Sequence, residues 1–224
     1  MNSIPRSEHP KPQFQRDSWM NLNGLWAFEI DNGRSGKARG LSAADAQLSG
    51  QILVPFCPQS ELSGVNHKDF LSGVWYRRTF ELTKEQLSGR VALHFGAVDY
   101  RCEAFVNGVS VGTHTGGYVS FCFDVTEAVR EGENVLTVYA EDDERDPLIP
   151  RGKQSELFYS HGCDYTRTTG IWQTVWMEFL PETHIEKIKI FPNVETGSFD
   201  VEALLKGAGT LAVEASYEGR PMGA

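Results

Sequence analysis

The sequence predicts an all-β protein, and three observations lead to this prediction. Apolar and polar residues alternate with a period of two between turn residues, as they do in half-buried strands. Helical periodicity is almost absent, because only Leu41–Leu48 and Lys84–Leu87 could form a turn or two of helix. The strands are short and recur about every 8–12 residues, which is the strand spacing typical of an antiparallel sandwich.

Turn residues set the limits of the early strands. Leu25–Ile30 is closed by an Asp-Asn-Gly turn, and Gln51–Val54 is stopped by a proline, whose nitrogen carries no proton for a sheet hydrogen bond. The aromatic-rich strand Val74–Leu82 and the strand Arg90–Val98 lie on either side of the short linker TKEQLSG.

A hairpin is the clearest local feature of the chain. Arg101–Val106 and Val109–Gly112 flank Asn107-Gly108, a pair that tolerates the positive φ angles of a two-residue type I′ turn. Three further strands are expected: Tyr118–Val125 after a Gly-Gly pair, Asn134–Glu141 after a Gly-containing turn, and Ile171–Leu180 after a long polar loop.

A domain boundary is expected at Pro181. At least eight short strands precede it, which suits a jelly roll, in which two sheets pack face to face. Three more follow, at His184–Phe191, Phe199–Leu205 and Thr210–Tyr217. An immunoglobulin-like domain needs about seven strands, so residues 182–224 are expected to be its truncated start, with Glu218–Pro221 a turn that has no return strand. Alternatively, these three strands extend the first sandwich, residues 1–181.

Composition narrows the class of protein. Lys and Arg number 21 and Asp and Glu 30, a net charge of −9, which argues against nucleic acid or an anionic membrane as partner. No stretch of about 18 apolar residues suggests a membrane span, and the first residues lack the apolar run of a signal peptide. Four cysteines without a CxxC pair favour reduced thiols in a cytoplasmic protein. Neither a metal nor a cofactor is expected.

Eight short motifs occur in an order typical of one known family. They are NLNGLWAF (21–28), WYRRTF (75–80), LHFGAVD (93–99), FVNGVSVG (105–112), GGYVSFCFDV (116–125), GENVLTV (132–138), PRGKQ (150–154) and TTGIWQTV (168–175). The set resembles the N-terminal domain of glycoside hydrolase family 2, the β-galactosidase, β-glucuronidase and β-mannosidase group. The resemblance implies a sugar-binding jelly-roll (galactose-binding-like) domain, then an immunoglobulin-like domain and a TIM barrel.

This resemblance also implies where catalysis takes place. Retaining glycosidases use two carboxylates about 5–5.5 Å apart, and in this family both come from the barrel. The chain is therefore expected to contain no catalytic residue and to be inactive alone, as the accessory part of an enzyme of carbohydrate metabolism that cleaves β-galactosides or β-glucuronides. The implied partners are a terminal β-linked sugar, the barrel of the same protein and possibly further copies of it.

One loop of the family's first domain reaches the sugar site, just before the Gly-Ile-aromatic motif. In the galactosidases and glucuronidases an Asp there contacts the sugar or helps to hold a cation beside it. Counting back from Gly170 places Asp164 at this position. A carboxylate accepts charge-assisted hydrogen bonds from sugar hydroxyls. Relatives with PRGKQ often carry Trp there, and the alternative is a solvated loop acid.

Other residues of the same loop are candidates for substrate contact. Arg167 would orient the loop, pair with Asp164 or be a surface charge. Arg151 and Lys153 would touch substrate or dock against the barrel. His161 would donate a hydrogen bond or simply be exposed. Tyr165, like Phe158, would stack on a sugar ring or pack within the loop.

Four tryptophans lie on predicted strands and offer a second interpretation. A tryptophan stripe would suit a stand-alone carbohydrate-binding module, whereas buried tryptophans would be core or interdomain packing; the residues are Trp26, Trp75, Trp172 and Trp176. A third interpretation is an interaction domain with no sugar role. Asp99, beside Tyr100 and Arg101, is expected to be a turn acid.

Overall fold

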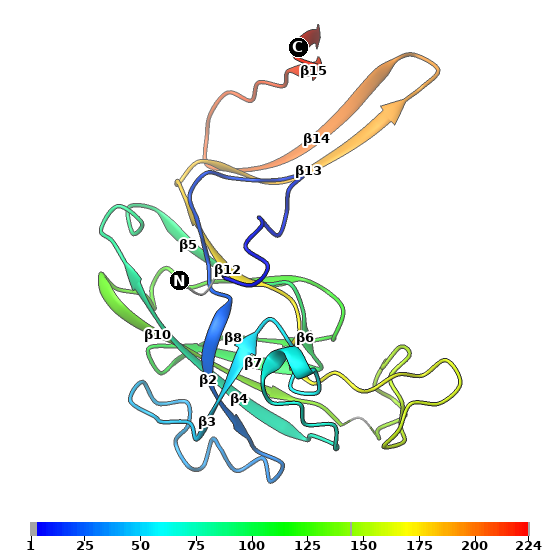
Figure 1. The fold of residues 1–224 in the computed structure, drawn as a ribbon. Coiled ribbons are helices and arrows are strands. Elements are labelled where there is room, and N and C mark those ends of the chain that lie inside the picture. Colours follow the sequence, from blue (N-terminus) through cyan, green and yellow to red (C-terminus); the bar gives the residue numbers. More distant parts are fainter. Residues whose placement is uncertain (1–3, 144, 224) are drawn as a thin grey trace. The chain divides into compact units, whose positions relative to one another are not determined.

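The computed structural model describes residues 4–143 and 145–223 (Figure 1). The prediction of an all-β chain is confirmed, because the described residues form strands and one single-turn 3-10 helix, η1 (Glu61–Ser63). The chain divides into two compact units, Met1–Phe179 and Leu180–Ala224. None of the helical structure in the described part of the chain is long and apolar enough to cross a membrane.

The first unit is a jelly-roll sandwich of two main antiparallel sheets. The six-stranded sheet has the order β3 (Gly50–Val54), β2 (Gly24–Ile30), β4 (Gly73–Leu82), β10 (Gly132–Glu141), β7 (Arg101–Val106) and β8 (Val109–Thr115). The four-stranded sheet has the order β1 (Trp19–Asn21), β12 (Val175–Leu180), β5 (Arg90–Phe95) and β9 (Phe121–Asp124). A small third sheet pairs β11 (Gly170–Ile171) with β6 (Val98–Asp99).

Local sequence explains the central pairings. Strands β4 and β10 pair over their whole length, from Gly132 opposite Leu82 to Glu141 opposite Gly73. The predicted hairpin between β7 and β8 is present, with φ of 52° at Asn107 and 83° at Gly108. Asn and Gly are the residues that adopt this left-handed backbone most readily.

Apolar side chains from both sheets fill the core between them. Trp26, Trp75 and Trp176 are each at most 1% exposed. Trp26 donates its indole hydrogen to the Leu22 carbonyl, and Trp75 donates to the Asp31 carboxylate. Trp26 belongs to the core between the sheets, whereas Trp75 lies in a second buried cluster with Leu41, Phe105 and Tyr139. Trp176 is stacked on His94. All three are packed and form no exposed stripe.

Several strands are shorter than expected. The stretch Arg90–Val98 divides into β5 and β6, and Ile171–Leu180 divides into β11 and β12, because the chain turns between them. At this turn the Gly96 amide donates to the Thr174 carbonyl at 2.9 Å. The expected helical turns at Leu41–Leu48 and Lys84–Leu87 are non-helical turns, since so few residues cannot nucleate an isolated helix.

The second unit consists of two hairpins. Strand β13 (His184–Asn193) pairs with β14 (Ser198–Lys206), and β15 (Ala215–Tyr217) pairs with β16 (Arg220–Gly223). The expectation that no return strand follows Glu218 is therefore wrong. Glu218 and Gly219 both adopt positive φ, 48° and 77°, and make the predicted turn, which joins β15 to β16.

Candidate functional site

The long loop between β10 and β11, residues 142–169, is described except at position 144. It carries the residues that the family resemblance singled out for contact with substrate. Two backbone pairings shape its outer part. The Ser155 amide donates to the Tyr165 carbonyl at 2.8 Å, and the Tyr165 amide donates to the Lys153 carbonyl at 2.7 Å. At the tip, the amide of Asp164 donates to the carbonyl of His161 at 2.8 Å, and the amide of His161 donates back at 3.1 Å. The loop is thus a small folded structure with a tight turn at residues 161–164.

Gln154, at the end of the PRGKQ motif, fastens the base of the loop to the sandwich. Its amide nitrogen donates to the Asp99 carboxylate at 2.7 Å and to the Tyr118 hydroxyl at 3.0 Å. Its amide oxygen accepts from the Thr168 amide at 2.6 Å. The Tyr118 hydroxyl in turn donates to the Arg151 carbonyl at 2.6 Å. One buried amide therefore joins three segments of the chain.

Asp99 is a buried acceptor of this network and not a plain turn acid as expected. It is 1% exposed. Burial raises the pKa of its carboxyl to about 6, while the hydrogen bond from Gln154 acts in the opposite direction. Its side chain also fits closely against Gly117, where a Cβ atom would lie 2.2 Å from Asp99 Oδ1.

Arg167 orients the loop from inside. It is 1% exposed, and its guanidinium lies over the Phe70 ring at 4.3 Å. The guanidinium donates to four backbone carbonyls, those of Lys68, Ser155, Leu157 and Phe158. These contacts agree with the loop-orienting interpretation of Arg167 and not with an exposed surface charge. The buried side chain presents almost no surface to a sugar.

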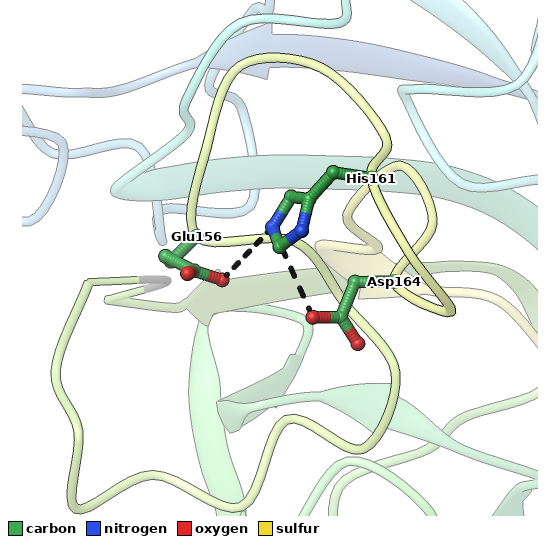
Figure 2. A group of neighbouring side chains, drawn as sticks. All are labelled: Glu156, His161 and Asp164. Atoms are coloured by element: carbon green, nitrogen blue, oxygen red, sulfur yellow. Dashed lines mark ion pairs between the residues drawn. The ribbon is translucent and has the colours of Figure 1, made fainter.

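Two other candidates, His161 and Asp164, lie close to Glu156 in this loop (Figure 2). His161 Nε2 lies 3.6 Å from Glu156 Oε2 and 3.9 Å from Asp164 Oδ2. Arg151 Nη2 donates to Glu156 Oε2 at 3.0 Å. A hydrogen bond from its own amide lowers the pKa of Glu156, desolvation acts in the opposite direction, and the neighbouring Arg151 and His161 lower the pKa further. Sequence reasoning missed Glu156, which joins Arg151 to the turn.

Aromatic side chains flank this charged cluster. Phe158, Tyr159 and Tyr165 are 59%, 64% and 63% exposed, and the Tyr159 ring meets the His161 ring edge-on at 6.4 Å between centroids. Lys153 is exposed beside them. Exposed rings next to charged hydrogen-bonding groups are the elements from which proteins build contacts to sugars or to other protein surfaces.

The one half-buried tryptophan of the four borders the base of the loop. The Trp172 indole donates to the Gly117 carbonyl at 2.8 Å, and its ring meets Tyr118 at 5.9 Å in an edge-on arrangement. A separate cavity of about 410 Å³ lies elsewhere on the sandwich, lined by the N-terminal segment and by residues such as His94 and Trp176. No loop residue lines that cavity.

A family model that matches most of the sandwich shows which family the chain belongs to. Residues 19–181 match the model described as glycosyl hydrolases family 2, sugar binding domain. The chain belongs to glycosyl hydrolase family 2. This family 2 domain is 33% identical over 123 residues to a β-galactosidase of Thermoanaerobacter pseudethanolicus, covering 54% of the chain. It is 30% identical over 184 residues to a putative β-glucuronidase of Formosa agariphila, covering 82% of the chain.

Solved structures of similar fold point to the same architecture. The β-glucuronidase from Ruminococcus gnavus in complex with D-glucaro 1,5-lactone superposes with a TM-score of 0.71 at 20% identity, covering 87% of this chain and 35% of that one. The chain spans only 16% and 21% of the lengths of the two curated relatives. The family 2 domain described here is thus a fraction of the size of the proteins that it matches.

Proposed function

We propose that this family 2 domain belongs to a larger β-glycosidase of the β-galactosidase or β-glucuronidase type. The names of its relatives and its small share of their length support the proposal. The whole enzyme would cleave a terminal β-linked sugar with retention, using two carboxylates about 5–5.5 Å apart that lie outside these residues. The 224 residues alone would not hydrolyse glycosides.

In this proposal the loop of residues 142–169 helps to shape the sugar pocket. The observation that carries it is the arrangement of the loop itself. Buried Gln154 and Arg167 hold its backbone, while Asp164 keeps its carboxylate at the surface, 27% exposed. Asp164 accepts hydrogen bonds from sugar hydroxyls. Arg151 and Lys153 contact the remainder of the enzyme beside it.

Replacing Asp164 in the whole enzyme tests the sugar contact. A hydrogen bond to a charged group is worth about 1.5–3 kcal/mol, so Asp164→Ala is expected to raise KM by roughly 10- to 100-fold. The measurement is steady-state hydrolysis of aryl β-galactosides and aryl β-glucuronides. Asp200→Ala, at an exposed position on β14, is the matched control. An unchanged KM in Asp164→Ala would refute the contact.

A stand-alone carbohydrate-binding module is the second candidate function. The exposed rings of Phe158, Tyr159 and Tyr165 favour it, although three of the four strand tryptophans are buried. Calorimetric titration of the chain with a panel of mono- and oligosaccharides separates the two functions. Saturable binding that is lost in Tyr165→Ala supports the module, and absence of binding supports the accessory role.

Two further expectations belong to this proposal. Residues 182–224 would be the first strands of an immunoglobulin-like domain, which the apolar side chains exposed on the β13–β14 hairpin support. The protein would work in the cytoplasm, which the absence of a CxxC pair among its four cysteines supports; these are Cys57, Cys102, Cys122 and Cys163.

A further inference from the structure

We propose that Glu156, His161 and Asp164 form a binding site for a divalent transition-metal ion, with Zn²⁺ as the preferred ion. One ligand atom from each residue lies within 4.8 Å of the other two. The site goes beyond the proposed function and does not depend on the sugar contact, because the metal can be bound and measured in the absence of any sugar.

Distances in the cluster suit a shared ion better than direct hydrogen bonds. His161 Nε2 is 3.6 Å from Glu156 Oε2 and 3.9 Å from Asp164 Oδ2, and both separations exceed a normal hydrogen bond. Zinc bonds to imidazole and carboxylate are about 2.0–2.2 Å long, so two tetrahedral ligands lie roughly 3.3–3.6 Å apart. The His161 nitrogen is within a few tenths of an ångström of this spacing from both carboxylates. Rotation of the two carboxylate side chains would bring their own oxygens, which lie within 4.8 Å of each other, to the same spacing.

The imidazole of His161 is directed between the two carboxylates (Figure 2). Its Nε2 atom is shielded from solvent and makes no hydrogen bond in the described structure. A neutral imidazole nitrogen with a free lone pair is the commonest metal ligand in proteins. A metal ion would therefore satisfy an atom that the protein itself leaves without a hydrogen bond.

Charge favours a cation at this point. Two carboxylates, those of Glu156 and Asp164, face the His161 imidazole. Arg151 donates to Glu156 Oε2 at 3.0 Å, which is the kind of outer hydrogen bond that fixes the orientation of a ligating carboxylate. An ion bound by one imidazole and two carboxylates matches Zn²⁺ or Co²⁺, whereas Ca²⁺ and Mg²⁺ prefer ligand sets made only of oxygen.

The loop holds the ligands in place before an ion binds. The turn between His161 and Asp164 is closed by two backbone hydrogen bonds. Glu156 follows Ser155, whose amide and carbonyl are both bound, the first to Tyr165 and the second to Arg167. The ligand side chains are 27–41% exposed, so water can complete the coordination shell.

Cobalt is the probe for the test, because its visible absorption reports the ligands and their geometry. The complete 224-residue chain is titrated with Co²⁺ alone, and Zn²⁺ is then added as competitor. The expected result is saturable binding of Co²⁺ that Zn²⁺ displaces. His161→Ala, Glu156→Gln and Asp164→Asn are each expected to weaken binding at least about tenfold, as loss of a metal ligand does.

Two control variants distinguish this site from other ligands. His67→Ala removes a partly exposed loop histidine elsewhere and is expected to bind Co²⁺ like the wild type. Cys163→Ser removes the exposed thiol of the same turn and is also expected to bind normally. Far-UV circular dichroism establishes that every variant is folded before titration.

Three outcomes would overturn the proposal. The first is an absence of saturable Co²⁺ binding by the wild-type chain, and the second is unchanged affinity in folded His161→Ala. The third is loss of binding in Cys163→Ser, with a thiolate-to-cobalt charge-transfer band in the wild type, which would assign the ion to the cysteine. None of these results bears on KM of Asp164→Ala in the whole enzyme, so the two proposals fail independently.

Discussion

Asp99 is a carboxyl group held where water cannot solvate its charge. It accepts a hydrogen bond from the neutral amide of Gln154, and burial raises its pKa to about 6 from 3.8. Between these two values the folded protein holds the proton more often than the unfolded chain does. The contribution of Asp99 to stability therefore falls as the pH rises through this window.

Replacing Asp99 by Asn should remove this pH dependence. The Asn carbonyl can still accept from Gln154 and carries no charge at any pH. The free energy of unfolding of Asp99→Asn relative to wild type is expected to rise by about 1–3 kcal/mol between pH 4 and pH 7.5, at about 1.4 kcal/mol per pKa unit. Urea denaturation at both pH values measures it.

The control for this prediction is Asp200→Asn, an exposed carboxylate on β14. Its difference from wild type should be the same at both pH values. If the difference in free energy of unfolding between Asp99→Asn and wild type were also the same at both pH values, Asp99 would have the same pKa in the folded and unfolded chain.

Strand β11 begins with a glycine, Gly170, that allows the strand to pack closely against a core tyrosine. Gly170 has a φ of 75°, and a Cβ there would lie 2.2 Å from the Tyr76 hydroxyl. This hydroxyl accepts a hydrogen bond from the Ile171 amide at 3.2 Å. Backbone conformation and space both require glycine, which explains the Gly-Ile pair that ends the loop.

Gly170→Ala is therefore expected to lower the free energy of unfolding by about 2–4 kcal/mol, since it adds a steric clash to an unfavourable left-handed backbone. Gly40→Ala is the matched control, with a φ of 78° and no atom within 4 Å of the added Cβ. It should cost only about 1 kcal/mol. Equal losses in urea denaturation would contradict the role of the Tyr76 contact.

Sequence predicted the elements whose signals are local. Alternation located β4 and β10, and Asn107-Gly108 located the hairpin. Three-residue β1 was missed because so short a strand carries no periodicity. Strand β16 was missed because its sequence, RPMG, contains a proline and a glycine and shows no alternation. A short strand that exists only because it pairs with a neighbouring strand cannot be recognised from its own residues.

The same limit applies to the candidate site. The Gly-Ile motif led to Asp164, which lies at the surface of the loop as expected of a binding residue. Burial of Arg167 could not be predicted, because arginine is almost always exposed unless paired. The contact of Gln154 with Asp99 joins residues 55 positions apart, and only the tertiary structure brings them together.

The two units of the whole molecule differ in how much they bury. The first unit has a continuous apolar core between its sheets. No residue of the second unit is buried among those that the structure describes. An isolated two-stranded hairpin is marginally stable in water, so the second unit should be held together far more weakly than the first.

Hydrogen exchange tests this difference in the 224-residue chain. Amides of β13 and β14 are expected to exchange nearly as fast as an unfolded peptide, whereas amides of β4 and β10 are expected to be protected up to the global free energy of unfolding. If amides of both units were equally protected from exchange, the second unit would have a stable core of its own, and this prediction would be wrong.

The loop of residues 142–169 separates the side chains that hold it from those that face outward. Gln154 and Arg167 anchor the backbone, while the rings of Phe158, Tyr159 and Tyr165 add little to the folded core. Substitutions at the outward positions are therefore nearly neutral for folding and can accumulate by drift. Descendants of such a sequence could acquire new ligand preferences at the loop tip while inheriting an unaltered sandwich.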